Sequence, residues 1–215
     1  RLMDGAVNNS YSNIDYGVGV RVLIGDQSGY AYVENITVED MLKAARTAAR
    51  IASANKGNKP LNLTEKELKK NYYTVASPWE EVSLKDKMPY LQKLNDRIFA
   101  LDKRVHKVQA SQSDTTSHIF FCNSEGVMFY DYRPMVTLGA VCIMEEDGKT
   151  ENGYAARAYR RGFDFLSDEV VDVIAREAVD QTSLLFKAIK PKGGEMPVVM
   201  GAGGCLLYTS DAADE

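Results

Sequence analysis

Two histidines and a cysteine are the side chains of this sequence that could together bind a metal ion. His106 and His118 are the only histidines, and Cys122 follows the second by four positions. If the histidines lay on neighbouring strands, they could face each other and imitate a zinc site with the cysteine. No carboxylate is spaced to hydrogen-bond to such imidazoles. We therefore interpret both histidines as structural or solvent-exposed, and expect no metal ligand among them.

Three arginines close together form a second candidate for binding chemistry. Arg157, Arg160 and Arg161 could line a groove and hold the carboxylate or the backbone carbonyls of a peptide, since guanidinium groups suit such acceptors. A solvated strand face explains the same pattern without a ligand, and we favour that interpretation.

Aromatic side chains gather between residues 120 and 132 and could stack against a substrate. On strands such residues usually make cross-strand pairs within a core, and we favour the core interpretation. The residues are Phe120, Phe121, Phe129, Tyr130 and Tyr132.

The glycine turn Gly201-Ala202-Gly203-Gly204 follows an apolar stretch and is similar to a phosphate-binding or dinucleotide-binding turn. That interpretation needs a helix directly after the glycines and an acidic residue about 20 positions later. The antiparallel pattern upstream argues against it, because a nucleotide-binding parallel sheet alternates strands with helices. Nucleotide binding is therefore the less favoured alternative.

Elements in the first third of the chain can be placed by periodicity. Residues 17–24 and 30–34 predict a β-hairpin with a turn at 25–29, and Thr37 can cap a helix that ends near 55–57. A surface loop over 55–68 and a short strand over 72–75 should follow. The positions expected at helical spacing are Val38, Met41, Leu42, Ala45, Ala48, Ala49 and Ala52.

Two further helices are predicted. Ser83 can cap the first, which Pro89 should kink or restart, and Ser167 can cap the second, which should end before Pro191. Their expected inward positions are Leu84, Met88, Leu91, Leu94, Ile98 and Leu101 in the first, and Val170, Val171, Ile174, Ala178, Leu185 and Ile189 in the second.

Residues 104–166 predict an antiparallel meander. Turn residues divide it at 114–116, 123–126, 133–134 and 146–149. Residues 135–144 are apolar on both alternating faces, so this strand should be central and covered on both sides. The expected fold is α+β, with a mostly antiparallel sheet and three packed helices.

Composition excludes several functional classes. With 45% hydrophobic residues and a net charge of −4, the chain is typical of a soluble globular protein and lacks the basic excess of a nucleic-acid surface. No apolar run approaches the roughly 18 residues that span a membrane, so we expect no membrane association and a cytoplasmic location. Cys122 and Cys142 have neither metal-knuckle spacing nor secreted-scaffold density, so both should be reduced and buried.

The order of several short motifs resembles one known family. They are Tyr16-Gly17-Val18-Gly19-Val20-Arg21-Val22-Leu23, Gly29-Tyr30-Ala31, Asn123-Ser124-Glu125-Gly126 and the turn Pro197-Val198-Val199-Met200-Gly201-Ala202-Gly203-Gly204. In this order they resemble the TldD/PmbA family of zinc metalloproteases, and the resemblance covers most of the chain. The final turn favours the TldD type, in which that segment leads into a helix carrying His-Glu-x-x-x-His.

This resemblance implies a function that the residues alone do not give. The chain would be the non-catalytic N-terminal part of a protease that encloses unfolded peptides, with Zn²⁺ in the full-length parent and none in this fragment. No catalytic residue, metal ligand or defined substrate-binding residue is expected here, so the fragment alone should be inactive. The family also implies a homodimer or a heterodimer with a PmbA-type subunit. The alternative is that the parent is itself that non-catalytic PmbA-type partner.

The last residues have a separate origin in our interpretation. Cys205-Leu206-Leu207-Tyr208-Thr209-Ser210-Asp211-Ala212-Ala213-Asp214 is the first-frame translation of a common transposase sequencing adapter. We expect residues 1–204 to be a TldD/PmbA-like N-terminal domain truncated at both ends, and 205–215 to be a non-native adapter-derived tail.

Overall fold

The computed structural model describes residues 1–52, 64–65, 73, 75–189, 192–195 and 197. Within this part the chain is α+β, with three α-helices and a mainly antiparallel arrangement of strands, which confirms the predicted fold class. The predicted strand 72–75 lies partly outside the described residues, and Tyr73 and Val75 are not in a strand.

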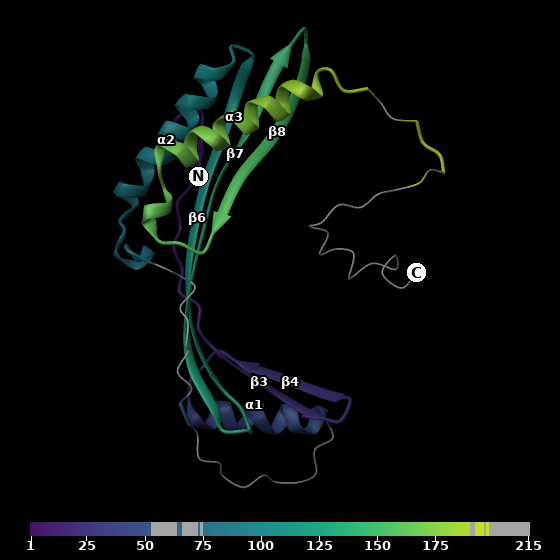
Figure 1. The fold of residues 1–215 in the computed structure, drawn as a ribbon. Helices are drawn as coiled ribbons and strands as arrows, with labels where there is room; N and C mark the ends of the chain where they lie inside the picture. The colour runs from purple at the N-terminus through teal and green to yellow at the C-terminus, as the bar shows by residue number, and fades with distance from the viewer. Residues whose placement is uncertain (53–63, 66–72, 74, 190–191, 196, 198–215) are drawn as a thin grey trace.

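Three long strands form the centre of the main sheet: β6 (Val105–Cys122), β7 (Val127–Glu146) and β8 (Lys149–Tyr159). β7 pairs antiparallel with both neighbours, so its predicted central position is confirmed. Beyond the end of β8, β6 and β7 continue together as a ribbon toward the other end of the molecule (Figure 1).

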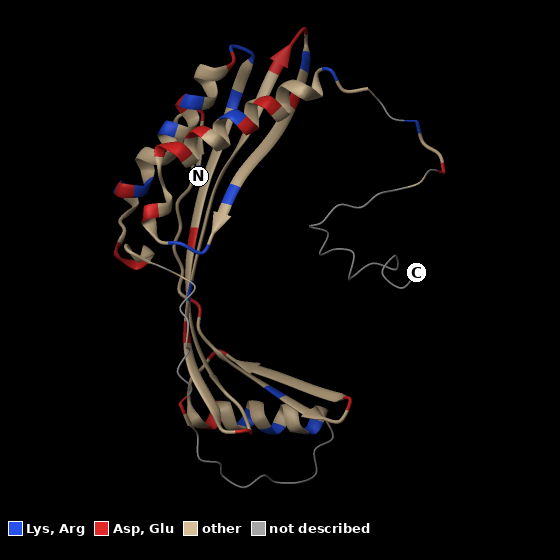
Figure 2. Cartoon of the chain, viewed as in Figure 1, with Lys and Arg blue, Asp and Glu red and all other residues tan. Residues whose placement is uncertain are grey.

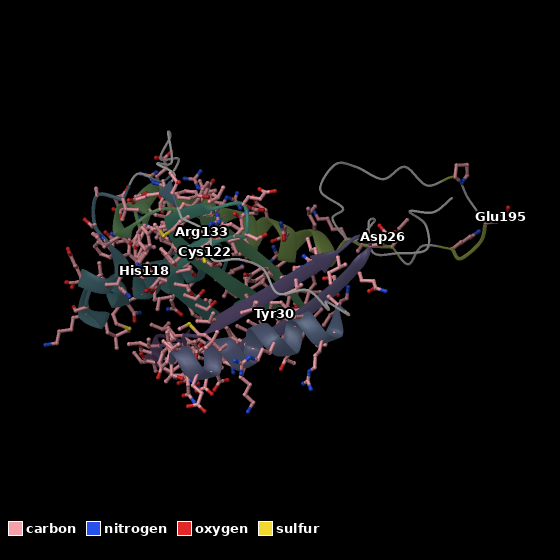
Figure 3. The ribbon with its side chains drawn as sticks, turned by 90° about the horizontal axis from the view of Figure 1, so that it is seen from below. Asp26, Tyr30, His118, Cys122, Arg133 and Glu195 are labelled. Carbon is pink, nitrogen blue, oxygen red and sulfur yellow. The ribbon has the colours of Figure 1, made fainter. Side chains whose placement is uncertain are left out.

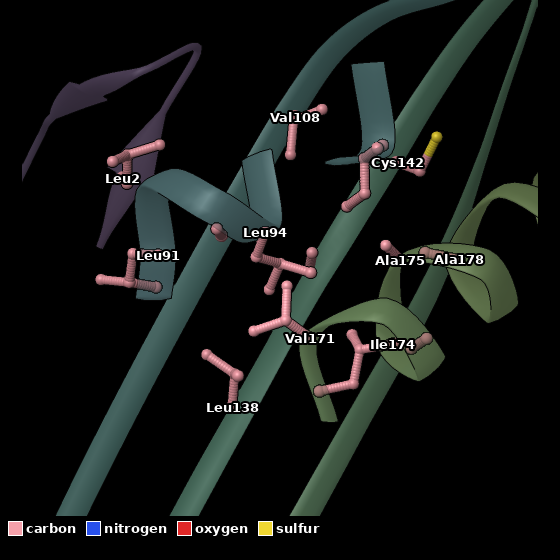
Figure 4. Close-up of a cluster of buried hydrophobic side chains, with 14 of the residues drawn as sticks. Leu2, Leu91, Leu94, Val108, Leu138, Cys142, Val171, Ile174, Ala175 and Ala178 are labelled. Carbon is pink, nitrogen blue, oxygen red and sulfur yellow. The ribbon is translucent and has the colours of Figure 1, made fainter. Parts of the chain in front are cut away.

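Helices α2 (Leu84–Leu101) and α3 (Asp168–Leu185) pack on one face of this sheet (Figure 1). Leu94 from α2 and Ile174 from α3 converge on Leu138 of β7 in the hydrophobic core (Figure 4). On the other face, Met135 of β7 is 38% exposed and Tyr154 of β8 is 54% exposed. Coverage on both faces was therefore a wrong prediction for the described residues, because both helices lie on the same side.

Two of the four predicted breaks in the meander are not turns. The ladder runs straight through Asp114 and Thr116, which pair with Val136 and Pro134. Proline lacks a backbone N–H, but on the side of β7 away from β6 the strand β8 pairs only from Val136 onward, so Pro134 needs no donor on that side. The predictions of turns at 114–116 and 133–134 were therefore wrong.

The other two predicted breaks are confirmed as hairpin turns. Asp147 and Gly148 both have positive φ, 51° and 75°, as a tight two-residue turn requires. At the β6–β7 turn, the side-chain oxygen of Asn123 accepts hydrogen bonds from the backbone N–H groups of Glu125 and Val127.

A second, smaller group consists of β3 (Val18–Ile24), β4 (Gln27–Val33) and α1 (Val38–Ile51), at the far end of the β6–β7 ribbon (Figure 1). The predicted hairpin is confirmed, although Ile24 pairs with Gln27 and the turn is shorter than predicted. Thr37 caps α1 by accepting a hydrogen bond from the Asp40 N–H. The helix ends at Ile51, earlier than predicted.

The inward face of α1 also differs from the prediction. Ala44, Ala48 and Ala52 are buried, whereas Val38 and Leu42 are 70% and 49% exposed. A Cβ on Gly29 of β4 would lie 2.0 Å from the Ala48 carbonyl oxygen, so only glycine permits this close contact. Small residues therefore set the distance between α1 and the hairpin.

The caps of the other two helices are confirmed. Ser83 and Asp86 form a capping box at α2, and the Ser167 hydroxyl accepts a hydrogen bond from the Val170 N–H at α3. α2 continues through Pro89 without restarting. The predicted inward positions of Leu84, Leu101 and Ile189 were wrong: the two leucines lie at the ends of α2 and are about half exposed, and Ile189 lies beyond the end of α3 and is 89% exposed.

Three very short strands complete the main sheet: β1 (Leu2–Met3), β2 (Ala6–Val7) and β5 (Thr64–Glu65). β5 pairs parallel with β7 inside the stretch that was predicted to be loop. Two 3₁₀ turns, η1 (Trp79–Glu81) and η2 (Phe163–Phe165), lead into α2 and α3.

Candidate functional site

A polar cluster forms around His118, on the part of the β6–β7 ribbon that α2 and α3 do not reach (Figures 1 and 3). His118 lies directly opposite Tyr132 on the ladder, and their rings meet edge to face with centroids 5.3 Å apart. Its Nδ1 atom is 2.6 Å from the Tyr130 hydroxyl. The pleat of two adjacent strands thus brings these three rings together.

Glu80 reaches this cluster from η1. One carboxylate oxygen, Oε1, lies 3.3 Å from His118 Nε2, and the other accepts a hydrogen bond from the Tyr132 hydroxyl at 3.3 Å. Both His118 and Glu80 are about half exposed, with 56% and 44% of their side-chain areas accessible. The contact therefore lies at the surface and within reach of a ligand.

Trp79 fixes the position of η1. Its side chain is buried, and the indole N–H donates a hydrogen bond to the Arg161 carbonyl at 2.8 Å. The Trp79 ring also packs edge to face on Phe163, with centroids 5.9 Å apart. These contacts hold η1 against Phe163 of η2 and the residues just before it, and the next residue, Glu80, reaches the ribbon.

The surroundings of Glu80 favour its charged form. Burial alone would raise the pKa of this carboxyl, but hydrogen bonds from its own backbone N–H, His118 and Tyr132 outweigh that cost and leave the pKa lowered. Thr116 also lowers the pKa of Glu80, although its buried hydroxyl makes no hydrogen bond that meets the full distance and angle criteria. Burial and the nearby Glu80 charge raise the pKa of Tyr132, which stays a proton donor.

A cavity of about 630 Å³ opens beside this cluster. Its size falls within the roughly 300–1,000 Å³ typical of ligand sites. We call it the Glu80 pocket. It is lined by Tyr73, Val75, Pro78, Glu80, Glu81, His118 and Tyr132.

The three predicted arginines do not form one binding site. Arg157 is bound to Glu177 of α3 at 2.6 Å, and Arg161 forms an ion pair with Asp164. Arg160 does not line the Glu80 pocket, but its guanidinium lies 5.3 Å from the centre of the ring of Tyr73, which does. More widely, basic and acidic side chains are interspersed on α2, whereas α3 carries mainly acidic ones (Figure 2).

The aromatic residues form cross-strand pairs but not a core. Phe121 stacks on Phe129 with ring centroids 5.0 Å apart. Phe120 and Tyr130 are nevertheless 66% and 53% exposed. The core interpretation was wrong for this half of the ribbon, because no helix among the described residues covers it.

Sequence reasoning missed Glu80, one of the two carboxylates that line the pocket. Thirty-eight positions separate it from His118, and the run Trp79-Glu80-Glu81 has no spacing that points to a site. Only the tertiary contact of η1 with the ribbon reveals it.

Two family profiles match most of the chain. Residues 77–186 match the PmbA/TldA metallopeptidase central domain, and residues 1–52 match PmbA/TldA metallopeptidase domain 1. The first match alone covers more than half of the 215 residues. The chain belongs to the PmbA/TldD metallopeptidase family. The resemblance read from the sequence motifs is thereby confirmed.

Curated relatives of this PmbA/TldD chain are similar along nearly all of it. The "Metalloprotease TldD homolog" of Haemophilus influenzae is 32% identical over 219 residues, covering 96% of this chain and 45% of that protein. A protein of the same name from Buchnera aphidicola subsp. Schizaphis graminum is 28% identical over 216 residues, with 96% and 44% covered. The chain thus spans less than half the length of these relatives.

Solved structures agree with the fold. A candidate modulator of a DNA gyrase from Thermotoga maritima has a TM-score of 0.65 at 18% identity, over 90% of this chain and 43% of that one. A similarly described protein from Bacteroides thetaiotaomicron has a TM-score of 0.59 at 14% identity, over 78% and 39%. At these identities the likeness concerns the fold alone.

Metalloprotease relatives imply a metal ion in full-length family members. Across the described residues no three His, Cys, Asp or Glu side chains are grouped to hold one. His106 and His118 lie twelve positions apart on the single strand β6, which is about 40 Å at roughly 3.3 Å per residue. The idea that they face each other was wrong, since they share one strand. The described residues do not fit zinc, and we derive no catalytic step through it.

The two described cysteines, Cys122 and Cys142, lie in different environments. Cys142 is buried as predicted, and burial raises the pKa of its thiol, but Cys122 is exposed near the β6–β7 turn, so its predicted burial was wrong. The turn at 201–204 and the tail at 205–215 lie outside the described residues.

No helix in the part of the chain that the structure describes has the length and apolar composition to cross a bilayer.

Proposed function

We propose that this chain is the N-terminal, non-catalytic part of a TldD-like zinc metalloprotease that encloses unfolded peptides for hydrolysis. The observation that carries this proposal is the 32% identity, over 96% of the chain, to the Metalloprotease TldD homolog of Haemophilus influenzae. In this view hydrolysis and zinc binding depend on other parts of the parent protein, and this part contributes binding surface.

The arrangement of the chain supports a binding role. The β6–β7 ribbon leaves Phe120 and Tyr130 exposed, and one face of the sheet leaves Met135 and Tyr154 exposed. The Glu80 pocket opens along the same ribbon. Apolar rings beside a polar pocket suit an extended chain, whose side chains and backbone are both accessible.

We further propose that the parent is cytoplasmic and acts as a homodimer or beside a PmbA-type subunit. The family assignment supports this proposal. The β3–β4 hairpin supports it as well, because Leu23, Tyr30 and Tyr32 are all more than half exposed on the face away from α1. Apolar surface of this kind is typical of contacts with another chain or domain.

Binding to an unfolded chain tests the enclosing role. A small disulfide-bonded protein, labelled with a fluorophore, would be titrated with the chain in its native form and again after reduction and alkylation. Fluorescence anisotropy should rise with the unfolded form and stay flat with the native form. Equal binding of the two forms, or no binding of either, would contradict the proposal.

A further inference from the structure

We infer that the Glu80 pocket is a subsite for a basic side chain, Arg or Lys, of the bound peptide. This inference rests on the proposed function, since it assigns a preference to a peptide that the chain is proposed to enclose. It is carried by three observations: the charge of the pocket, the rings in its wall and its accessible volume.

Negative charge is concentrated on one side of the pocket. Glu80 and Glu81 are adjacent on η1, and both line the cavity. Glu80 is held in place by His118 and Tyr132. A carboxylate positioned in advance binds a cation with little further loss of side-chain freedom, and charge-assisted hydrogen bonds are stronger than neutral ones.

Aromatic rings supply the rest of the recognition surface. Tyr73 and Tyr132 both line the cavity, and the face of an aromatic ring attracts an ammonium or guanidinium group. The chain already contains one such contact, because the Arg160 guanidinium lies 5.3 Å from the Tyr73 ring centre. One of the rings that line the pocket therefore already contacts a guanidinium of this chain.

The position of the pocket suits a side chain of an extended peptide. His118 and Tyr132 lie on the ribbon, and Glu80 and Glu81 lie on η1 beside it, so the cavity is open between two segments. A volume of about 630 Å³ exceeds what one side chain needs and leaves room for ordered water around the charged group. A peptide running along the ribbon could place one long basic residue here.

Two matched peptides test this inference with the whole 215-residue chain. Both would be short, unstructured and fluorescein-labelled, with apolar and polar residues around one central Arg or, in the second peptide, citrulline. Citrulline keeps the shape of Arg and removes its charge. We expect the Arg peptide to bind about tenfold more tightly by anisotropy.

Substitution of the two glutamates locates the preference. The double variant E80Q/E81Q should bind both peptides equally, at the affinity of the citrulline peptide for the unsubstituted chain. The control variant E39Q/D180N removes the same charge from exposed positions on α1 and α3 and should keep the preference. Circular dichroism spectra of each variant, compared with that of the unsubstituted chain, check that the variant is folded.

Each alternative outcome has a distinct meaning. Equal binding of both peptides to the unsubstituted chain would overturn the subsite and leave the proposed function standing. Binding of neither peptide would contradict both. An Arg preference that survives in E80Q/E81Q would place the cation site elsewhere and overturn the inference.

Discussion

His118 and Glu80 join two distant segments of the chain, with the imidazole Nε2 atom 3.3 Å from the carboxylate Oε1 atom. The contact links η1 to the part of the β6–β7 ribbon that lies beyond the pairing with β8. Tyr132, opposite His118 on the ladder, donates to the second carboxylate oxygen. The glutamate is thereby held by two groups of the ribbon and forms one wall of an open pocket.

The titration of Glu80 provides a first prediction. Its pKa is lowered in the folded chain, so its stabilising contribution should be present above the ordinary glutamate pKa of about 4.3 and be lost as pH falls through the lower folded value. Carbon-detected NMR of the side-chain carboxyl should give a midpoint below that of exposed glutamates. In Tyr132→Phe, which loses one hydrogen bond, the midpoint should rise.

The same linkage predicts how stability depends on pH. The unsubstituted chain should exceed E80Q in free energy of unfolding near neutral pH by no more than about 1 kcal/mol, because solvent screens a half-exposed carboxylate. The difference should vanish at acid pH. A difference that grows as urea unfolding is repeated at lower pH would contradict the assigned direction.

Truncation of the core gives a second prediction. Leu138 is fully buried in the hydrophobic core beneath α2 and α3. Leu138→Ala should lower the free energy of unfolding by about 2–5 kcal/mol in urea titration. Leu184→Ala is the matched control, because Leu184 is 66% exposed and its truncation should cost less than about 0.5 kcal/mol. Equal losses would mean that the core is misplaced.

Gly29 gives a third prediction. Its Cβ would lie 2.0 Å from the Ala48 carbonyl oxygen and 2.8 Å from the Ala52 nitrogen, both of which are backbone atoms of α1 or its cap. Gly29→Ala should therefore push α1 away from the hairpin and destabilise the group of β3, β4 and α1. Hydrogen exchange should quicken in α1 and be unchanged in α3. Gly193→Ala, with open space around it, should alter neither helix.

Much of the fold could be predicted because local chemistry determines it. Thr37, Ser83 and Ser167 begin helices as capping residues should. Asp147 and Gly148 form the expected hairpin turn. The predicted breaks at Asp114 and Pro134 were wrong because both residues are paired within the long β6–β7 ladder, and β8 does not extend to Pro134.

The candidate site could not be predicted, because it depends on packing between distant segments. His118 was recognised as a residue capable of chemistry, but its partner Glu80 is brought to it only when Trp79 packs against Phe163. The exposed ring of Phe120 was missed for a related reason. Its strand pattern is that of a core, and only the position of the helices shows that nothing described covers it.

Metal binding by this chain provides a fourth prediction. The described histidines lie far apart on one strand, so the chain should bind no zinc at one-to-one stoichiometry and cleave no peptide. Equilibrium dialysis followed by atomic emission measures the bound metal. Tight one-to-one binding that is lost in His106→Ala or His118→Ala would show that these histidines are ligands after all.

The central claim, that this chain is part of a TldD-like metalloprotease, is tested most directly in the source DNA. The measurement is the uninterrupted genomic reading frame downstream of the codon for Gly204. We predict a short apolar stretch and then His-Glu-x-x-x-His, in which the two histidines would be metal ligands and the glutamate would be the general base, as the resemblance to TldD-type proteases implies. An intact frame that continues without this motif would contradict the claim and favour the PmbA-type partner.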